Sequence, residues 1–146
     1  MTVQLLAYKG AGNFVNAGIR HWGDSQYSHT ELRIGGRCYS SSIMDGGVRW
    51  KDIIIKPEHW DVLDLPWADA NAALAWFKIH EGEEYGVSDL LLCQFFGMRR
   101  DGRGAFCSEA DAAALGIPNP TRHSPQSLWD ECVFMNEKYA EWTGRR

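Results

Sequence analysis

Along the first half of the chain, apolar and polar residues alternate in the way that β-strands require. Three such runs predict strands at residues 2–8, 48–56 and 60–65. A fourth run, 28–43, has Gly35-Gly36 near its centre, and this pair is typical of a two-residue turn between antiparallel strands. The first half is therefore expected to form a sheet that contains a hairpin.

In the second half, the apolar residues follow helical spacing. Asp69 and Ser124 are suitable N-cap residues. Gly82 and Gly116 are typical of the position just after a helix end. Together with the apolar spacing, these signals predict helices at 70–82, 89–96, 107–115 and 126–132. In the first half, similar apolar spacing predicts one further helix at 13–22. We expect residues 1–146 to form a single α+β domain.

Composition and charge exclude several classes of protein. The 146 residues suffice for one hydrophobic core, and 45% apolar with 23% charged residues is typical of a globular chain. The net charge is −4 and no basic block occurs, so nucleic acid is not an expected partner. The sequence has no apolar run long enough for a transmembrane span, and its first ten residues do not resemble a signal peptide.

One cysteine stands out among Cys38, Cys93, Cys107 and Cys132. Their spacing does not match a zinc site, and a disulfide framework is not expected without a secretion signal, so we predict no metal and no bridges. Cys107 lies at the predicted start of a helix, where backbone N–H groups and the helix dipole stabilise a thiolate and an oxyanion. The alternative is that Cys107 is an ordinary buried cysteine.

The predicted hairpin places polar side chains together. Counting outward from the Gly-Gly turn predicts four cross-strand pairs: Ile34 with Arg37, Leu32 with Tyr39, Glu31 with Ser40, and His29 with Ser42. The last two pairs share one face. A cysteine nucleophile needs a base with an orienting partner, and His29 with its neighbours is able to supply both. The alternative is a solvated strand face on which Glu31 pairs with Arg20 or Arg33.

Five segments of the chain match the motifs of one enzyme family. They are YSHTEL (27–32), GGRCYSSS (35–42), YGVSDLLL (85–92), FCSEADAAALG (106–116) and RHSPQSLWD (122–130). The chain resembles the circularly permuted papain-like hydrolases, which are relatives of the NlpC-type cell-wall peptidases and include small phage and bacterial proteins. His29 precedes Cys107, and this order is that of the permuted branch.

The resemblance implies a papain-like fold, in which an antiparallel sheet packs against the helix that carries the nucleophile. It implies Cys107 as the nucleophile and His29 as the base, with no cofactor. The position that orients the base in many relatives matches Ser40, which is a poor orienter. Glu31, two residues after His29 on the same face, is the better candidate, and Ser40 is the alternative third member.

The resemblance also implies a reaction. It points to hydrolysis of an amide bond through an acyl-enzyme intermediate, with the peptides of peptidoglycan as the leading substrate. One alternative is hydrolysis or transfer of acyl groups from lipid esters or amides, because permuted relatives include acyl-handling enzymes. Another is a non-catalytic structural or binding module of a phage that retains the fold. The absence of a signal peptide favours a cytoplasmic or phage-associated protein.

Overall fold

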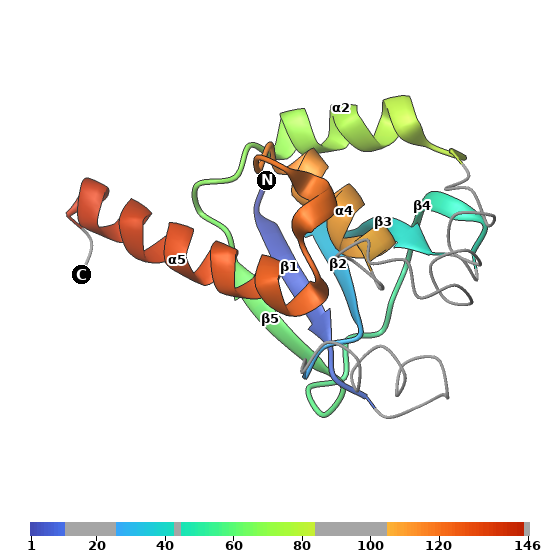
Figure 1. Cartoon of the computed structure of the whole chain (residues 1–146), viewed down its shortest axis with the longest axis horizontal. Helices are drawn as coiled ribbons and strands as arrows, with labels where there is room; N and C mark the ends of the chain where they lie inside the picture. The colour runs from blue at the N-terminus through green and yellow to red at the C-terminus, as the bar shows by residue number, and fades with distance from the viewer. Residues whose placement is uncertain (11–25, 43–44, 84–104, 145–146) are drawn as a thin grey trace.

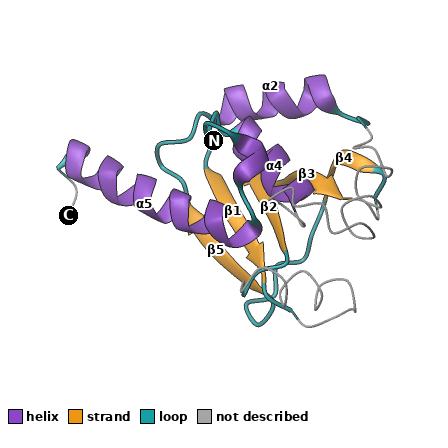
Figure 2. Ribbon diagram, viewed as in Figure 1, coloured by secondary structure: helices purple, strands orange, loops and turns teal. Residues whose placement is uncertain are grey.

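The computed structural model describes residues 1–10, 26–42, 45–83 and 105–144. The helices expected at 13–22 and 89–96 lie outside the described residues, as do Arg20 and Cys93. Within the described part, the chain is a mixed α+β structure with helices packed on an antiparallel sheet (Figures 1 and 2). The α+β class expected from the sequence is therefore confirmed.

The described residues form a sheet of five strands in the order β4-β3-β2-β1-β5, and every neighbouring pair is antiparallel. Its strands are β1 (Val3–Tyr8), β2 (His29–Ile34), β3 (Arg37–Ser42), β4 (Gly47–Lys51) and β5 (Trp60–Asp64). The strand β2, which begins with the predicted base, lies at the centre of the sheet. Its backbone is therefore held by strands on both sides.

In the described part of the chain, three helices pack around this sheet: α2 (Ala70–His80), α4 (Ala105–Ala114) and α5 (Pro125–Thr143), with a short 3-10 turn, η1 (Pro120–Arg122), before α5. Helix α4 contacts β2 and β3, while α5 contacts β1 and extends beyond the sheet towards the C-terminus (Figure 1). Asp69 caps α2, and Ser124 caps α5 in a reciprocal capping box. None of the helices in the described ranges is long and apolar enough to cross a membrane.

The core lies between the sheet and these helices. Its buried members come from alternate strand positions and from the inner helix faces, and they include Val3, Leu5, Leu32, Ile34, Val48, Ala110, Ala112, Ala114, Leu128 and Cys132. Burying one leucine or isoleucine side chain contributes about 1.5–3 kcal/mol. The small alanine side chains of α4 let this helix approach the sheet closely. As a result, the first turn of α4 lies next to the start of β2.

The hairpin has the turn that the sequence predicts. Gly35 and Gly36 both have positive φ, 58° and 87°, as a two-residue turn of this kind requires. The predicted pairs Ile34–Arg37 and Leu32–Tyr39 are confirmed. The paired ladder between these two strands ends at Leu32–Tyr39. The expected pairs of Glu31 with Ser40 and His29 with Ser42 are therefore not part of it.

Two predicted boundaries were wrong by five or more residues. The strand expected at 48–56 ends at Lys51, because Lys51 pairs with Cys38 near the beginning of β3 and the chain beyond it has no strand to pair with. The last helix, expected at 126–132, continues to Thr143. Its sequence contains no proline or glycine between these points, and it stops where Gly144 adopts a left-handed conformation with φ 69°.

Candidate active site

Cys107 is the third residue of α4, so its sulfur lies at the positive end of the helix dipole. The side chain is hydrogen-bonded to His29, and the backbone N–H groups of Thr30 and Ser108 also point at the sulfur. Burial alone would raise the pKa of this thiol. The imidazolium of His29 and the backbone donors outweigh burial and lower the pKa of Cys107 below its ordinary value of 9.0.

His29 is the first residue of β2 and contacts both Cys107 and Glu31. Its Nε2 lies 2.6 Å from Oε1 of Glu31, so Nδ1 is the ring nitrogen that remains for the sulfur. Burial would lower the pKa of His29, but the neighbouring thiolate and carboxylate raise it to about 10. Each group therefore favours the charged form of the other, the Cys107 thiolate and the His29 imidazolium, which together are the reactive form of a cysteine nucleophile.

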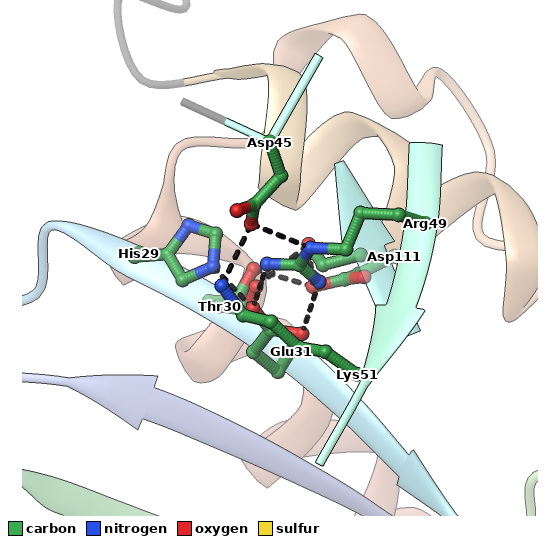
Figure 3. Close-up of polar contacts among 8 residues, drawn as sticks. His29, Thr30, Glu31, Asp45, Arg49, Lys51 and Asp111 are labelled. Atoms are coloured by element: carbon green, nitrogen blue, oxygen red, sulfur yellow. Dashed lines mark hydrogen bonds and ion pairs between the residues drawn. The ribbon is translucent and has the colours of Figure 1, made fainter. Parts of the chain in front are cut away.

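Glu31 is fully buried, and its charge is balanced by contacts on both oxygens (Figure 3). Arg49 of β4 donates from Nη1 to Oε2 at 2.7 Å and from Nη2 to Oε1 at 2.6 Å. Burial would raise the pKa of Glu31, but the hydrogen bonds from His29 and Arg49 lower it below its ordinary value of 4.5. Glu31 is thus an anion that accepts a hydrogen bond from the His29 ring, and this fixes the tautomer and orientation of the imidazole.

Arg49 continues the network towards solvent. Its Nε donates to Asp45 at 2.8 Å, and Lys51 donates to the same carboxylate oxygen at 2.7 Å. We call the six groups Cys107, His29, Glu31, Arg49, Asp45 and Lys51 the alternating-charge network. Their charges alternate in sign from the buried sulfur to Lys51, whose side chain is 44% exposed. Figure 3 shows the part of this network from His29 to Lys51. The network thus contains equal numbers of positive and negative groups.

The sequence reasoning missed Arg49. Pairing with Arg20 or Arg33 was only the alternative for Glu31; the structure places Arg49 on this carboxylate, and Arg20 is outside the described residues. Arg49 reaches β2 across the intervening strand, where the residue paired with it is the small Ser40. The signal available in the sequence was the position of Arg49 in a short strand next to the hairpin.

Ser40 occupies a different position from the one that the hairpin count suggested. Its hydroxyl donates to the backbone oxygen of Thr30 at 2.8 Å and lies 3.4 Å from Asp111 of α4. The same Asp111 oxygen accepts a hydrogen bond from Thr30 Oγ1 at 2.7 Å. The structure therefore brings Cys107, His29 and Glu31 together and directs Ser40 to Thr30 and Asp111.

Aromatic side chains border the base. The Trp60 ring of β5 meets the His29 ring edge-on at 6.4 Å between centroids. Tyr8 of β1 packs against Trp60 at 5.0 Å and against His59 at 6.0 Å. These rings limit the movement of His29 and provide an apolar wall beside it.

The remaining histidines of the structurally described segments do not form a second site of this kind. His80 bonds the Trp76 backbone oxygen within its own helix, and the backbone oxygen of His123 accepts the Ser108 hydroxyl at 2.5 Å. In the described ranges, no cluster of three or more histidine, cysteine or acidic side chains has the arrangement of a metal site.

No family model, curated protein or solved structure matches the chain. The functional assignment accordingly depends on the geometry of the site.

Proposed function

We propose that the protein is a cysteine hydrolase of the permuted papain-like type, with Cys107 as nucleophile, His29 as base and Glu31 as the residue that orients the base. The observation that carries the proposal is the unbroken series of hydrogen bonds from Cys107 to His29 and from His29 to Glu31. Nucleophile, base and orienter in direct contact are the arrangement required for acyl transfer through a thioester.

The reaction begins with attack of the Cys107 thiolate on the carbonyl carbon of an amide. The carbonyl oxygen becomes an oxyanion, for which the N–H of Cys107, in the first turn of α4, is the donor that we assign. His29 gives its proton to the leaving nitrogen as the C–N bond breaks, which releases the amine and leaves a thioester. Water then attacks the thioester, His29 accepts a proton from it, and the carboxylic acid and the free thiolate are released.

Glu31 and Arg49 hold His29 in position during this cycle. The carboxylate of Glu31 stabilises the imidazolium in the resting state, and Arg49 holds the carboxylate ionised and immobile. Removing the charges of Glu31 and Arg49 from water costs free energy, and a non-catalytic binding module would gain little from burying them. The buried, fully paired Glu31 therefore favours an enzyme over a non-catalytic module.

For the substrate, we propose a peptide amide, and the resemblance to NlpC-type peptidases points to the peptides of peptidoglycan. The test is incubation of the purified protein with peptidoglycan fragments, with mass spectrometry of the products. We expect new amine and carboxyl termini at one type of amide bond, and we expect Cys107→Ala to abolish them. Products from lipid esters or amides instead would assign the acyl-handling alternative. Absence of Cys107-dependent products from both substrate classes would contradict the hydrolase proposal.

A further inference from the structure

Asp111 is a buried acid that the mechanism above does not use. It lies on α4 four residues after Cys107, so both side chains project from the same side of the helix, one turn apart. Asp111 is fully buried. None of the ion pairs among the described residues includes it. A carboxyl group next to a nucleophile, with no cation in contact, requires an explanation.

The hydrogen bonds around Asp111 fit a neutral carboxylic acid. Its Oδ2 accepts from Thr30 Oγ1 at 2.7 Å and lies 3.4 Å from Ser40 Oγ. A serine hydroxyl has one proton, and Ser40 donates it to the backbone oxygen of Thr30 at 2.8 Å. Ser40 therefore reaches Asp111 only as a long second contact, and among the described residues Thr30 is the one short hydrogen-bond donor to this carboxyl. Among the described residues, Oδ1 of Asp111 has no hydrogen-bond partner that would stabilise a charge.

The electrostatic surroundings act in the same direction. Burial raises the pKa of Asp111 well above its ordinary value of 3.8, and the negative charges of Cys107 and Glu31 raise it further, against the opposing effects of Thr30 and His29. The titratable groups that face it are Cys107 on α4, His29 and Glu31 on β2, and Cys132 on α5. An ionised Asp111 would repel the thiolate.

We propose that Asp111 is a positioning residue whose neutral carboxyl ties the nucleophile helix to β2 and keeps Cys107 in contact with His29. Thr30 lies between His29 and Glu31, so a hydrogen bond to its side chain fixes the strand segment that carries both. The inference rests on the proposed function, because the contact that Asp111 maintains is the contact between nucleophile and base. The neutral form provides this link without adding a negative charge next to the sulfur.

The experiment measures the rate of Cys107 alkylation by iodoacetamide as a function of pH, by peptide mapping, in the wild-type chain, Asp111→Asn and Asp111→Ala. Asparagine retains a neutral, hydrogen-bonding side chain of the same size. We expect its pH midpoint to stay within about 0.3 units of the wild-type value. Alanine removes the link, and we expect its rate at neutral pH to fall by about tenfold or more because the sulfur and the imidazole move apart.

A second variant keeps the test valid if Asp111→Ala does not fold. Thr30→Val removes the 2.7 Å hydrogen bond to Asp111 while keeping the shape of the side chain, and it is expected to lower the same rate. Ser40→Ala, which removes only the 3.4 Å contact with Asp111 and the bond to the Thr30 backbone, is the matched control and is expected to change the rate little. Infrared spectroscopy should show a protonated carboxyl band at neutral pH that disappears in Asp111→Asn.

Three outcomes would overturn the inference. A midpoint that falls by a unit or more in Asp111→Asn would mean that the wild-type aspartate is ionised. A wild-type rate in folded Asp111→Ala, with selective alkylation of wild-type Cys107, would contradict this inference alone. Wild-type Cys107 that is not alkylated selectively would contradict the proposed function and the inference together.

Discussion

Glu31 and Asp111 are two fully buried carboxyl groups on the two sides of the Cys107–His29 pair, and their partners differ completely. Glu31 accepts from Arg49 and His29, whereas Asp111 accepts from the hydroxyl of Thr30. Accordingly, the pKa of Glu31 is lowered and that of Asp111 is raised.

This difference between Glu31 and Asp111 shows that burial alone does not decide the charge of an acid in this protein. Burial disfavours both carboxylates, and only Glu31 has cationic donors in contact to reverse the effect. The ionised acid stabilises the imidazolium of the base. In our proposal the neutral Asp111 links α4 to β2, whereas as a second anion it would destabilise the Cys107 thiolate.

The largest effect is expected from removing the cation that keeps Glu31 ionised. Arg49→Met leaves a buried, largely unpaired carboxylate and should lower the free energy of unfolding by about 3–5 kcal/mol, measured by urea denaturation. Lys51→Met is the matched control, because it removes a cation of the same network at its exposed end, and it should cost less than about 1 kcal/mol. Equal losses in the two variants would mean that Glu31 does not depend on Arg49.

The two acids should also give opposite dependences of stability on pH. The folded-state pKa of Glu31 lies below 4.5, so its contribution is complete above that pH and is lost as the pH falls through the folded-state pKa. The folded-state pKa of Asp111 lies above 3.8, so its contribution is complete below that pH and is lost as the pH rises towards the folded-state pKa.

Urea denaturation at a series of pH values in Glu31→Gln and Asp111→Asn separates these contributions. Glu31→Gln should flatten the loss of stability on the acid side, and Asp111→Asn should flatten the loss on the alkaline side. Flattening on the same side in both variants would show that the two acids have the same charge.

A smaller effect is expected on the thiol itself. Glu31→Gln removes the anion that stabilises the imidazolium, so the pH midpoint of Cys107 alkylation should rise by about one unit. Ser40→Ala should leave the midpoint within about 0.3 units. Circular dichroism of each variant verifies that the fold is retained. A shift in Ser40→Ala alone would assign the orienting role to β3.

The smallest effect is expected at the outer part of the alternating-charge network. Asp45→Asn removes the carboxylate that Arg49 and Lys51 share, but Arg49 keeps both hydrogen bonds to Glu31. We expect a loss of less than about 1 kcal/mol in the free energy of unfolding and an unchanged alkylation midpoint. A raised midpoint would extend the functional part of the network to Asp45.

Local patterns allowed much of this site to be predicted. The glycine turn fixed the pairs nearest to it, and the two-residue spacing of His29 and Glu31 put them on one side of β2, where they are in contact. The helix start at Cys107 was predicted two residues late. Each of these features depends on neighbours in sequence, which propensity and periodicity describe well.

The remaining parts depend on packing between distant elements. Arg49 contacts Glu31 across an intervening strand, and nothing in the local pattern of 48–51 specifies that contact. Asp111 had a visible signal, because it follows Cys107 by one helical turn, but its burial depends on how closely α4 approaches β2. The count from the turn also did not predict that the pairing of β2 with β3 ends at Leu32–Tyr39.

The central claim is that Cys107 is a thiolate paired with the imidazolium of His29, and the pH dependence of its alkylation rate tests this most directly. The midpoint, unlike the absolute rate, does not depend on how accessible the sulfur is. We predict a midpoint well below that of a free cysteine, about 8.5, which rises towards that value in folded His29→Ala. Cys38 and Cys132, whose pKa values burial raises to about 11 and about 12, should react only at high pH. A wild-type Cys107 midpoint at or above that of a free thiol, unchanged in His29→Ala, would contradict the account.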